Sequence, residues 1–265
     1  MTALCRLLLL MLVALLLADC ANIRPLSGDA SGAVSQISGG SEAWQRAKVH
    51  TELAALYYRD GNMSVALEEL RIAMEAEPAY APAYNMFGLV HMHLREFPRA
   101  DEHFRHALAL AANDPEINNN YGWFLCQTGR PHDALAYFMA ALKSSLYSTP
   151  ERAYLNAGTC ALKAGEDAAA EDYLQKALRY GRPMPQAYVL LAAIQYRRGN
   201  LGEAKRLLTE LYRQAEPSAE SLWLSLRIER SLGDRLAETG YATQLRRRFP
   251  NSPEGLALSK GKFDE

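Results

Sequence analysis

Four histidines lie close together in one stretch of the sequence: His91, His93, His103 and His106. Imidazole nitrogens bind zinc and other transition metals, so such a cluster could serve a metal-dependent enzyme. On a helix, however, His91 and His93 would point to different faces, and only His103 and His106 would share one. No acidic residue accompanies them at the spacing of the metal-binding HExxH motif. We therefore expect no metal, and we interpret these histidines as surface or inter-repeat side chains.

Other catalytic patterns are missing from the sequence. It has no Gly-x-Ser-x-Gly nucleophile elbow, no cysteine in a recognisable catalytic setting with histidine, and no glycine-rich loop of the kind that holds phosphates. The formal net charge of −1 gives no basic footprint for nucleic acid. We therefore expect a protein that is not an enzyme and that uses no cofactor, small-molecule substrate or nucleic-acid partner.

The first residues have the pattern of a secretory signal. Arg6 precedes an apolar run, Leu7–Ala18, which is shorter than the roughly 20 residues that a membrane-spanning helix needs. We predict a signal peptide over residues 1–19. The run ends at Leu17-Ala18-Asp19-Cys20, which resembles a bacterial lipobox, although Asp19 departs from the small neutral residue usual there.

The lipobox resemblance implies that Cys20 is lipidated and becomes the first residue of the mature chain. Several acyl chains would hold the protein at a membrane, since each buried methylene contributes about 0.8 kcal/mol. Ala21 would imply sorting to the outer membrane, on its periplasmic face. The alternatives are cleavage without a lipid or a retained anchor. Residues 20–46 are rich in Asn, Ser, Gly and Ala, and we predict a flexible tether with a lead-in to the first helix.

Beyond the tether, turn signals recur at intervals of about 34 residues, the period of tetratricopeptide repeats. The turns begin at Gly61, Arg95, Gly129, Gly165, Gly199 and Gly233. A small residue lies at a fixed distance before the first five turns, and an alanine lies at a fixed distance after them. The small residues are Ala54, Gly88, Gly122, Gly158 and Ala192, and the alanines are Ala66, Ala100, Ala134, Ala170 and Ala204. A glycine inside a helix costs about 1 kcal/mol relative to alanine, so the glycines indicate close crossing of two helices.

This pattern predicts an all-α fold, a right-handed α-solenoid of tetratricopeptide helix-turn-helix repeats. The repeat region spans residues 47–252, and a tail, which we expect to be a frayed helix end, spans 253–265. Repeat three is longer than the others, with the extra length near residues 144–149. The six predicted repeats cover residues 47–80, 81–114, 115–150, 151–184, 185–218 and 219–252.

The first helices of such repeats line a concave face, which is the usual binding surface. Repeats two and three place Trp, Met and Leu side chains beside amides on that face, a mixture that suits an extended or helical peptide. The groove residues that we predict are Asn85, Leu89, Met92, Glu116, Asn119 and Trp123.

Two cysteines fall at nearly equivalent places on the first helices of repeats three and four. These are Cys126 and Cys160. In an oxidising compartment they could form a disulfide if their Cα atoms lie within about 7 Å of each other. The alternative is two buried free thiols.

Three short segments resemble the type IV pilus biogenesis lipoproteins of the PilF/PilW family. They read Asn-Asn-Tyr-Gly-Trp-Phe-Leu-Cys over 119–126, Leu-Tyr at 146–147 in the long repeat, and Tyr-Leu-Asn at 154–156. The resemblance implies an outer-membrane pilotin that helps a pilus secretin subunit to reach the outer membrane and multimerise, or that stabilises the pilus with other pilus proteins. The alternative is a general periplasmic scaffold that recruits envelope enzymes, such as peptidoglycan synthases.

Overall fold

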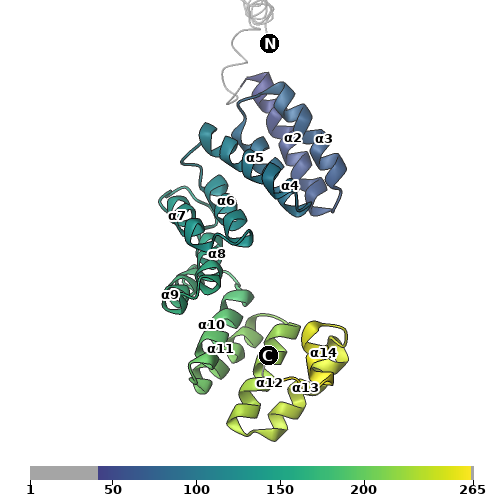
Figure 1. Ribbon diagram of the computed structural model, residues 1–265, viewed down its shortest axis with the longest axis vertical. Coiled ribbons are helices and arrows are strands. Elements are labelled where there is room, and N and C mark those ends of the chain that lie inside the picture. The colour runs from purple at the N-terminus through teal and green to yellow at the C-terminus, as the bar shows by residue number, and fades with distance from the viewer. Residues whose placement is uncertain (1–40, 264–265) are drawn as a thin grey trace, which may run out of the picture. The chain divides into compact units, whose positions relative to one another are not determined.

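The segments between the predicted turns form pairs of antiparallel helices. The computed structural model describes residues 41–263, and Figure 1 shows the pairs following one another along the chain. No strand occurs in this part of the chain. The helices are α2 (Glu42–Arg59), α3 (Met63–Ala76), α4 (Ala81–His93), α5 (Phe97–Leu110), α6 (Pro115–Gln127), α7 (Pro131–Leu142), α8 (Pro150–Lys163), α9 (Asp167–Leu178), α10 (Pro185–Arg197), α11 (Leu201–Gln214), α12 (Ala219–Leu232), α13 (Arg235–Arg248) and α14 (Pro253–Ser259).

Local sequence explains where these helices start and stop. Proline stands at or next to the first residue of several of them, as at Pro115 and Pro150, where its missing N–H leaves no helical bond unmade. Most hairpin turns use a glycine with positive φ, such as Gly129 at 84°. Arg95 takes the glycine's place in the second pair with φ of 62°, a left-handed conformation that costs a side chain about 1 kcal/mol.

The two helices of a pair cross at the small residues that the sequence marks. A Cβ added to Gly88 would lie 2.7 Å from the Phe104 ring, and one added to Gly122 would lie 2.9 Å from the Phe138 ring. Phe104 and Phe138 are completely buried. The glycines therefore let α4 and α6 pack directly against the aromatic residues of α5 and α7, as the repeat pattern predicts.

The α7–α8 connection carries the extra length of repeat three. Tyr147 in this loop is buried between Ala141 and Ala153, and burial raises the pKa of its phenol to about 12. Its neighbour Leu146 is 90% exposed. The loop is thus anchored by one side chain while the next one projects into solvent.

Helical residues extend beyond both ends of the predicted repeat region. The first helix begins at Glu42, within the predicted lead-in, and the tail, for which we expected a frayed helix end, contains a short helix, α14. The Ser252 hydroxyl accepts a hydrogen bond from the Gly255 backbone N–H and so caps this helix. Leu258 is buried against the last pair, and Phe263 stacks on Trp223 of α12 at 5.7 Å. These contacts hold the tail in place.

The predicted signal peptide and the lipidation site at Cys20 lie outside the described residues. Within residues 41–263, no helix combines the length and the apolar character that crossing a membrane requires. From Glu42 onward the helices form one compact unit.

Candidate functional site

The first helices of four consecutive pairs line one surface hollow of about 530 Å³, which we call the groove. Its residues come from α2, α4, α6 and α8, and they recur at helical spacing because one face of each helix is turned toward the hollow. The lining residues are Ala55, Tyr58, Arg59, Met86, Leu89, Glu116, Asn119, Asn120, Trp123, Arg152, Leu155 and Asn156.

The groove combines apolar and charged side chains. Leu89 and Trp123 are only partly buried, so their exposed surface is available for contact with another molecule. The Lys163 ammonium lies 5.9 Å from the centre of the Trp123 ring, which favours a cation–π contact. Arg59 and Glu116 add charges of opposite sign to the wall. A peptide with both apolar and charged side chains would match this lining.

A chain of asparagine amides runs along the floor of the groove. The Asn156 side-chain amide donates to the Asn119 carbonyl oxygen at 3.0 Å, and Asn119 donates to Asn120 at 3.4 Å. Asn120 in turn donates to Asn85 at 3.2 Å. These hydrogen bonds between uncharged amides therefore join α4, α6 and α8. Asn119 is only 1% exposed, so its amide connects helices and is not accessible to a partner.

Asn118, which directly precedes Asn119 in α6, does not belong to this chain of amides. Asn118 is buried on the other side of α6, where its amide donates to the backbone carbonyls of Ala112 and Asp114, both at 2.8 Å. Asp114 also caps α6, because its carboxylate accepts from the Ile117 N–H. Asn118 thereby fixes the turn that leads into the groove-lining helix.

Four of the predicted groove residues line the hollow: Leu89, Glu116, Asn119 and Trp123. Asn85 lies at the end of the amide chain, and Met92 packs beside the buried cluster around Phe104. Neither Asn85 nor Met92 is part of the lining. The predicted set leaves out eight lining residues. The same positions within the repeat find five of them in repeats one and four: Ala55, Tyr58, Arg59, Arg152 and Leu155. Repeat position alone does not find the other three, which are Met86, Asn120 and Asn156.

The sequence of this chain is similar to those of known proteins. A tetratricopeptide repeat model matches residues 125–187. The type IV pilus assembly protein PilF of Pseudomonas aeruginosa is 30% identical over 205 residues, which cover 77% of this chain and 81% of the relative. The chain belongs to the PilF family.

Two solved structures of the PilF family have the same fold. PilW, described as a widely conserved type IV pilus biogenesis factor, is 33% identical with a TM-score of 0.74, over 80% of this chain and 98% of PilW. Pseudomonas aeruginosa PilF is 28% identical with a TM-score of 0.76, over 84% of this chain and 100% of that structure. This PilF-family chain is thus a type IV pilus biogenesis protein with tetratricopeptide repeats, a scaffold that typically mediates protein–protein interaction.

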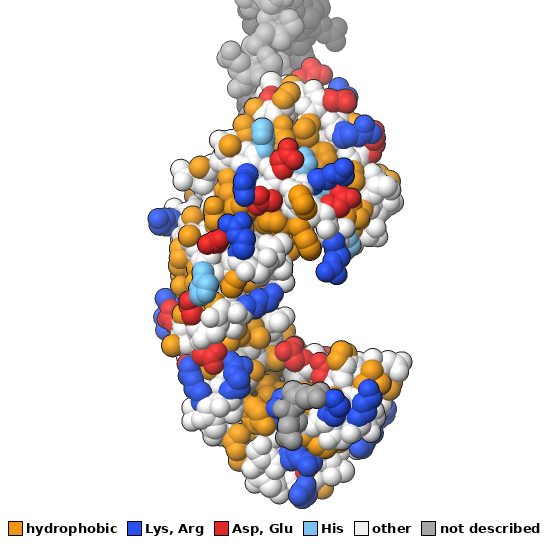
Figure 2. All heavy atoms as spheres, in the orientation of Figure 1, with side chains coloured by type: hydrophobic (Ala, Val, Ile, Leu, Met, Phe, Trp, Pro, Cys, Tyr) orange, Lys and Arg blue, Asp and Glu red, His pale blue; other side chains and the backbone are white. Residues whose placement is uncertain are grey.

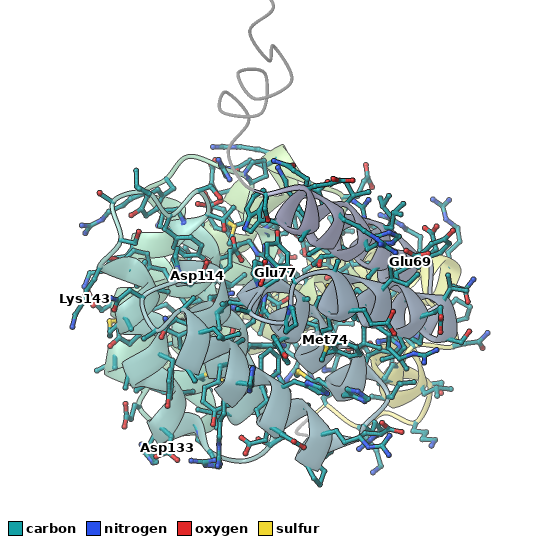
Figure 3. The ribbon with its side chains drawn as sticks, turned by 90° about the horizontal axis from the view of Figure 1, so that it is seen from above. Glu69, Met74, Glu77, Asp114, Asp133 and Lys143 are labelled. Carbon is teal, nitrogen blue, oxygen red and sulfur yellow. A yellow bond between two sulfur atoms is a disulfide. The ribbon has the colours of Figure 1, made fainter. Side chains whose placement is uncertain are left out.

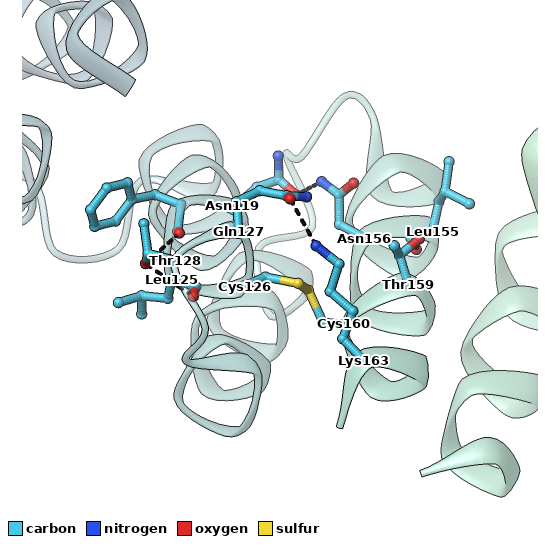
Figure 4. The surroundings of a disulfide bond; sticks show 11 residues. Asn119, Leu125, Cys126, Gln127, Thr128, Leu155, Asn156, Thr159, Cys160 and Lys163 are labelled. Carbon is cyan, nitrogen blue, oxygen red and sulfur yellow. Dashed lines mark hydrogen bonds between the residues drawn. A yellow bond between two sulfur atoms is a disulfide. The ribbon is translucent and has the colours of Figure 1, made fainter. Parts of the chain in front are cut away.

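A disulfide lies beside the groove of this PilF-family chain. It joins Cys126 of α6 to Cys160 of α8, whose Cα atoms are 5.7 Å apart. Figure 4 shows two further links around it: the hydrogen bond from the Asn156 side-chain amide to the Asn119 side-chain oxygen, and the Lys163 ammonium donating to the Gln127 side chain at 2.7 Å. Three links thus fix the spacing of two groove-lining helices.

Two of the clustered histidines stack on each other. His91 and His103 come from α4 and α5, their parallel rings lie 5.1 Å apart, and the Phe87 ring lies 4.8 Å from His103 and 6.1 Å from His91. His93 instead contacts Tyr58 at 5.7 Å, and His106 contacts Tyr84 at 4.1 Å. Burial, and then the electrostatic influence of His91, lower the pKa of His103. The faces of a single helix do not predict this stack, because its two rings meet across α4 and α5. Within residues 41–263, no three potential ligands are grouped to hold a metal.

Proposed function

We propose that this PilF-family protein is an outer-membrane lipoprotein that holds a segment of the pilus secretin subunit in its groove. By keeping that segment in place it would assist localisation and multimerisation of the secretin, or contribute to pilus stability. Family membership supports a role in pilus biogenesis, and the groove supports a role in binding. Cys20 is the proposed lipid attachment site, on the periplasmic face of the outer membrane.

The observation that carries this proposal is the continuity of the groove across four helix pairs. Neighbouring packed helices are about 8–10 Å apart, so four first helices present a surface roughly 30 Å long. An extended segment rises about 3.3 Å per residue, and about nine residues would fill that length. Such a segment would place apolar side chains on Leu89 and Trp123 and opposite charges near Arg59 and Glu116.

Alanine substitution of Trp123 tests the groove. We expect Trp123→Ala to weaken binding of the purified secretin subunit roughly tenfold, because tryptophans in partly desolvated pockets often dominate binding energy. Leu236→Ala serves as the control, since Leu236 is 86% exposed on α13 and outside the groove. Unaltered secretin binding by a Trp123→Ala protein of native helicity would remove the groove from the proposal.

The proteins that bind this chain distinguish the pilotin hypothesis from the alternative of a general periplasmic scaffold. Affinity isolation from envelope extracts with the wild-type chain should recover the secretin subunit, and the Trp123→Ala chain should recover less of it. Recovery of peptidoglycan synthases without secretin would instead favour the scaffold that recruits envelope enzymes.

The anchor is tested separately with Cys20→Ala. We expect the repeat region to fold normally while the protein moves from the membrane fraction to the soluble fraction, with fewer secretin multimers in the outer membrane. The physical reason is the loss of acyl chains, which supply about 0.8 kcal/mol per buried methylene. Unchanged fractionation would count against lipidation of Cys20.

A further inference from the structure

A second hollow of about 290 Å³ lies at the edge of repeat four, and none of its lining residues belongs to the groove. Tyr154 of α8 and Tyr180, just after α9, face each other with ring centroids 6.0 Å apart. Lys176 and Arg179 complete the lining, and we call these four residues the tyrosine edge. Tyr180 is 48% exposed, so one wall of the hollow is open to a partner.

The tyrosine edge adjoins the long loop of repeat three. Arg182, in the connection after α9, forms an ion pair of 2.6 Å with Glu151 at the start of α8, directly after that loop. The loop presents Leu146, which is 90% exposed and the most exposed large hydrophobic side chain among residues 41–263. Tyr147 is buried in the core and anchors the loop, so the backbone next to the exposed Leu146 is held in place. Two adjoining inter-repeat connections thus each expose an apolar side chain.

This edge has an excess of positive charge. Lys176 pairs with Asp172 at 2.6 Å, and the Glu151 partner of Arg182 is buried. Arg179 is exposed and makes no ion pair with a described residue. Lys143, at the start of the long loop, points outward at the periphery in Figure 3 and is likewise unpaired within residues 41–263. Uncompensated cations beside exposed apolar side chains call for an acidic partner.

We propose that the tyrosine edge is a second interaction surface that binds an acidic protein segment carrying an apolar side chain. Arg179 would receive a carboxylate through its planar guanidinium, and the apolar side chain would lie against the two tyrosine rings. Tyrosine and arginine are the residue types that most often dominate protein interfaces. Leu146 would add an apolar contact with such a protein segment, since removing apolar surface from water is favourable.

A direct binding measurement tests this surface. The probe is a short fluorescein-labelled peptide of glutamates interspersed with leucine and phenylalanine, and the same peptide with glutamine for glutamate is its control. By fluorescence anisotropy, we expect the full chain to bind the acidic peptide and not the control, and added salt to weaken binding. Arg179→Glu and Tyr180→Ala should each weaken it about tenfold or more, while Trp123→Ala in the groove should leave it unchanged.

The other outcomes overturn the proposal. No saturable binding, or equal binding by wild type and Arg179→Glu, would exclude the surface. Loss of binding in Trp123→Ala alone would assign the peptide to the groove. Cosedimentation with phosphatidylglycerol vesicles that Arg179→Glu abolishes, without peptide binding, would assign the edge to a lipid surface. Arg179→Gln and circular dichroism guard against misfolding, and the Trp123 variant keeps this test separate from the groove proposal.

Discussion

Repeats one to four and repeats five and six hold their helices together by different means. In the first block (α2–α9), glycines bring the helices of three of the four pairs into direct contact, while Ala54 stands at that position in α2, and a neutral amide chain and a disulfide join the groove-lining helices. In the second block (α10–α14), neither pair has a glycine there, because Ala192 stands at that position in α10 and Leu226 in α12. There the joint between pairs includes the Lys205–Glu229 ion pair at 2.9 Å.

This difference between the blocks corresponds to whether their helices line the groove. A groove formed by several helices needs fixed spacing between them, and the amide chain and the disulfide supply links that do not depend on salt. The second block carries no part of the groove, and its joints can tolerate ion pairs that depend on salt. On the face drawn in Figure 2, basic and acidic side chains are interspersed over the described helices.

The largest effect should come from the disulfide of the first block. Replacing Cys126 and Cys160 together with alanine should lower the free energy of unfolding by about 3 kcal/mol, because a crosslink across a sequence separation of 34 restricts the unfolded chain. Thermal unfolding with and without reductant checks this. Reductant should lower the midpoint of the wild type and leave the double variant unchanged. An equal response of both proteins, or an intact mass that reduction does not alter, would refute the disulfide.

A methyl group at a crossing should have the next largest effect. Gly122→Ala should destabilise the protein by about 1–3 kcal/mol, since the new Cβ would meet the Phe138 ring and the Ala134 carbonyl oxygen. Gly202→Ala in the second block is the matched control. That position has open space around it, so the substitution should stabilise by about 0.5–1 kcal/mol. Urea unfolding measures the free energy of unfolding of both variants. If both were destabilised, close helix crossing would not distinguish the first block from the second.

In the second block, the Lys205–Glu229 pair should respond to charge removal. Glu229 is buried, so Lys205→Met would leave its carboxylate without a partner, while the partial exposure of Lys205 limits the loss to about 1–2 kcal/mol. Salt should lower the stability of the wild type more than that of Lys205→Met. Comparing urea midpoints at low and high salt checks this. An equal salt response would show that the pair does not stabilise the joint.

The smallest effect should be a pH dependence confined to the first block. Burial lowers the pKa of His103 in the folded state, so the unfolded chain binds a proton more readily. Stability from this residue is therefore present above the ordinary histidine pKa and is lost as the pH falls through that value toward the lowered one. Urea unfolding at pH 7.5 and 5 should show a smaller pH difference for His103→Phe than for the wild type. His132→Phe, at a largely exposed position on α7, is the control.

Repeat spacing predicts much of this molecule and helical geometry predicts part of its groove. The recurrence of Gly88 and Gly122 before their turns is enough to place the crossings, because a close approach of two helices requires small residues at fixed distances. Counting positions within a repeat places Leu89 and Trp123 on the lining of the hollow, and the same count applied to repeat four would also reach Arg152. Such positions are predictable because each depends on one helix or one pair.

Repeat spacing does not predict contacts between side chains that lie on different helices. The Asn85–Asn120 bond depends on how α4 and α6 are displaced along each other, and no single-helix pattern contains that displacement. The His91–His103 stack has the same origin. The helix of the tail is likewise not predicted by repeat spacing, and the Phe263 ring that follows it meets Trp223, forty residues earlier in the sequence.

A stack of helix pairs has no inherent stopping point, because the face that receives one pair is regenerated by the pair that follows. Here α14 packs on both α12 and α13, as the first helix of each preceding pair packs on the pair before it. The Phe263 ring stacks on Trp223, and the Arg230 guanidinium lies 4.1 Å from its ring centre. The receiving face of the last pair is therefore occupied by a short helix and an aromatic side chain of the same molecule, where each earlier pair receives another complete helix pair.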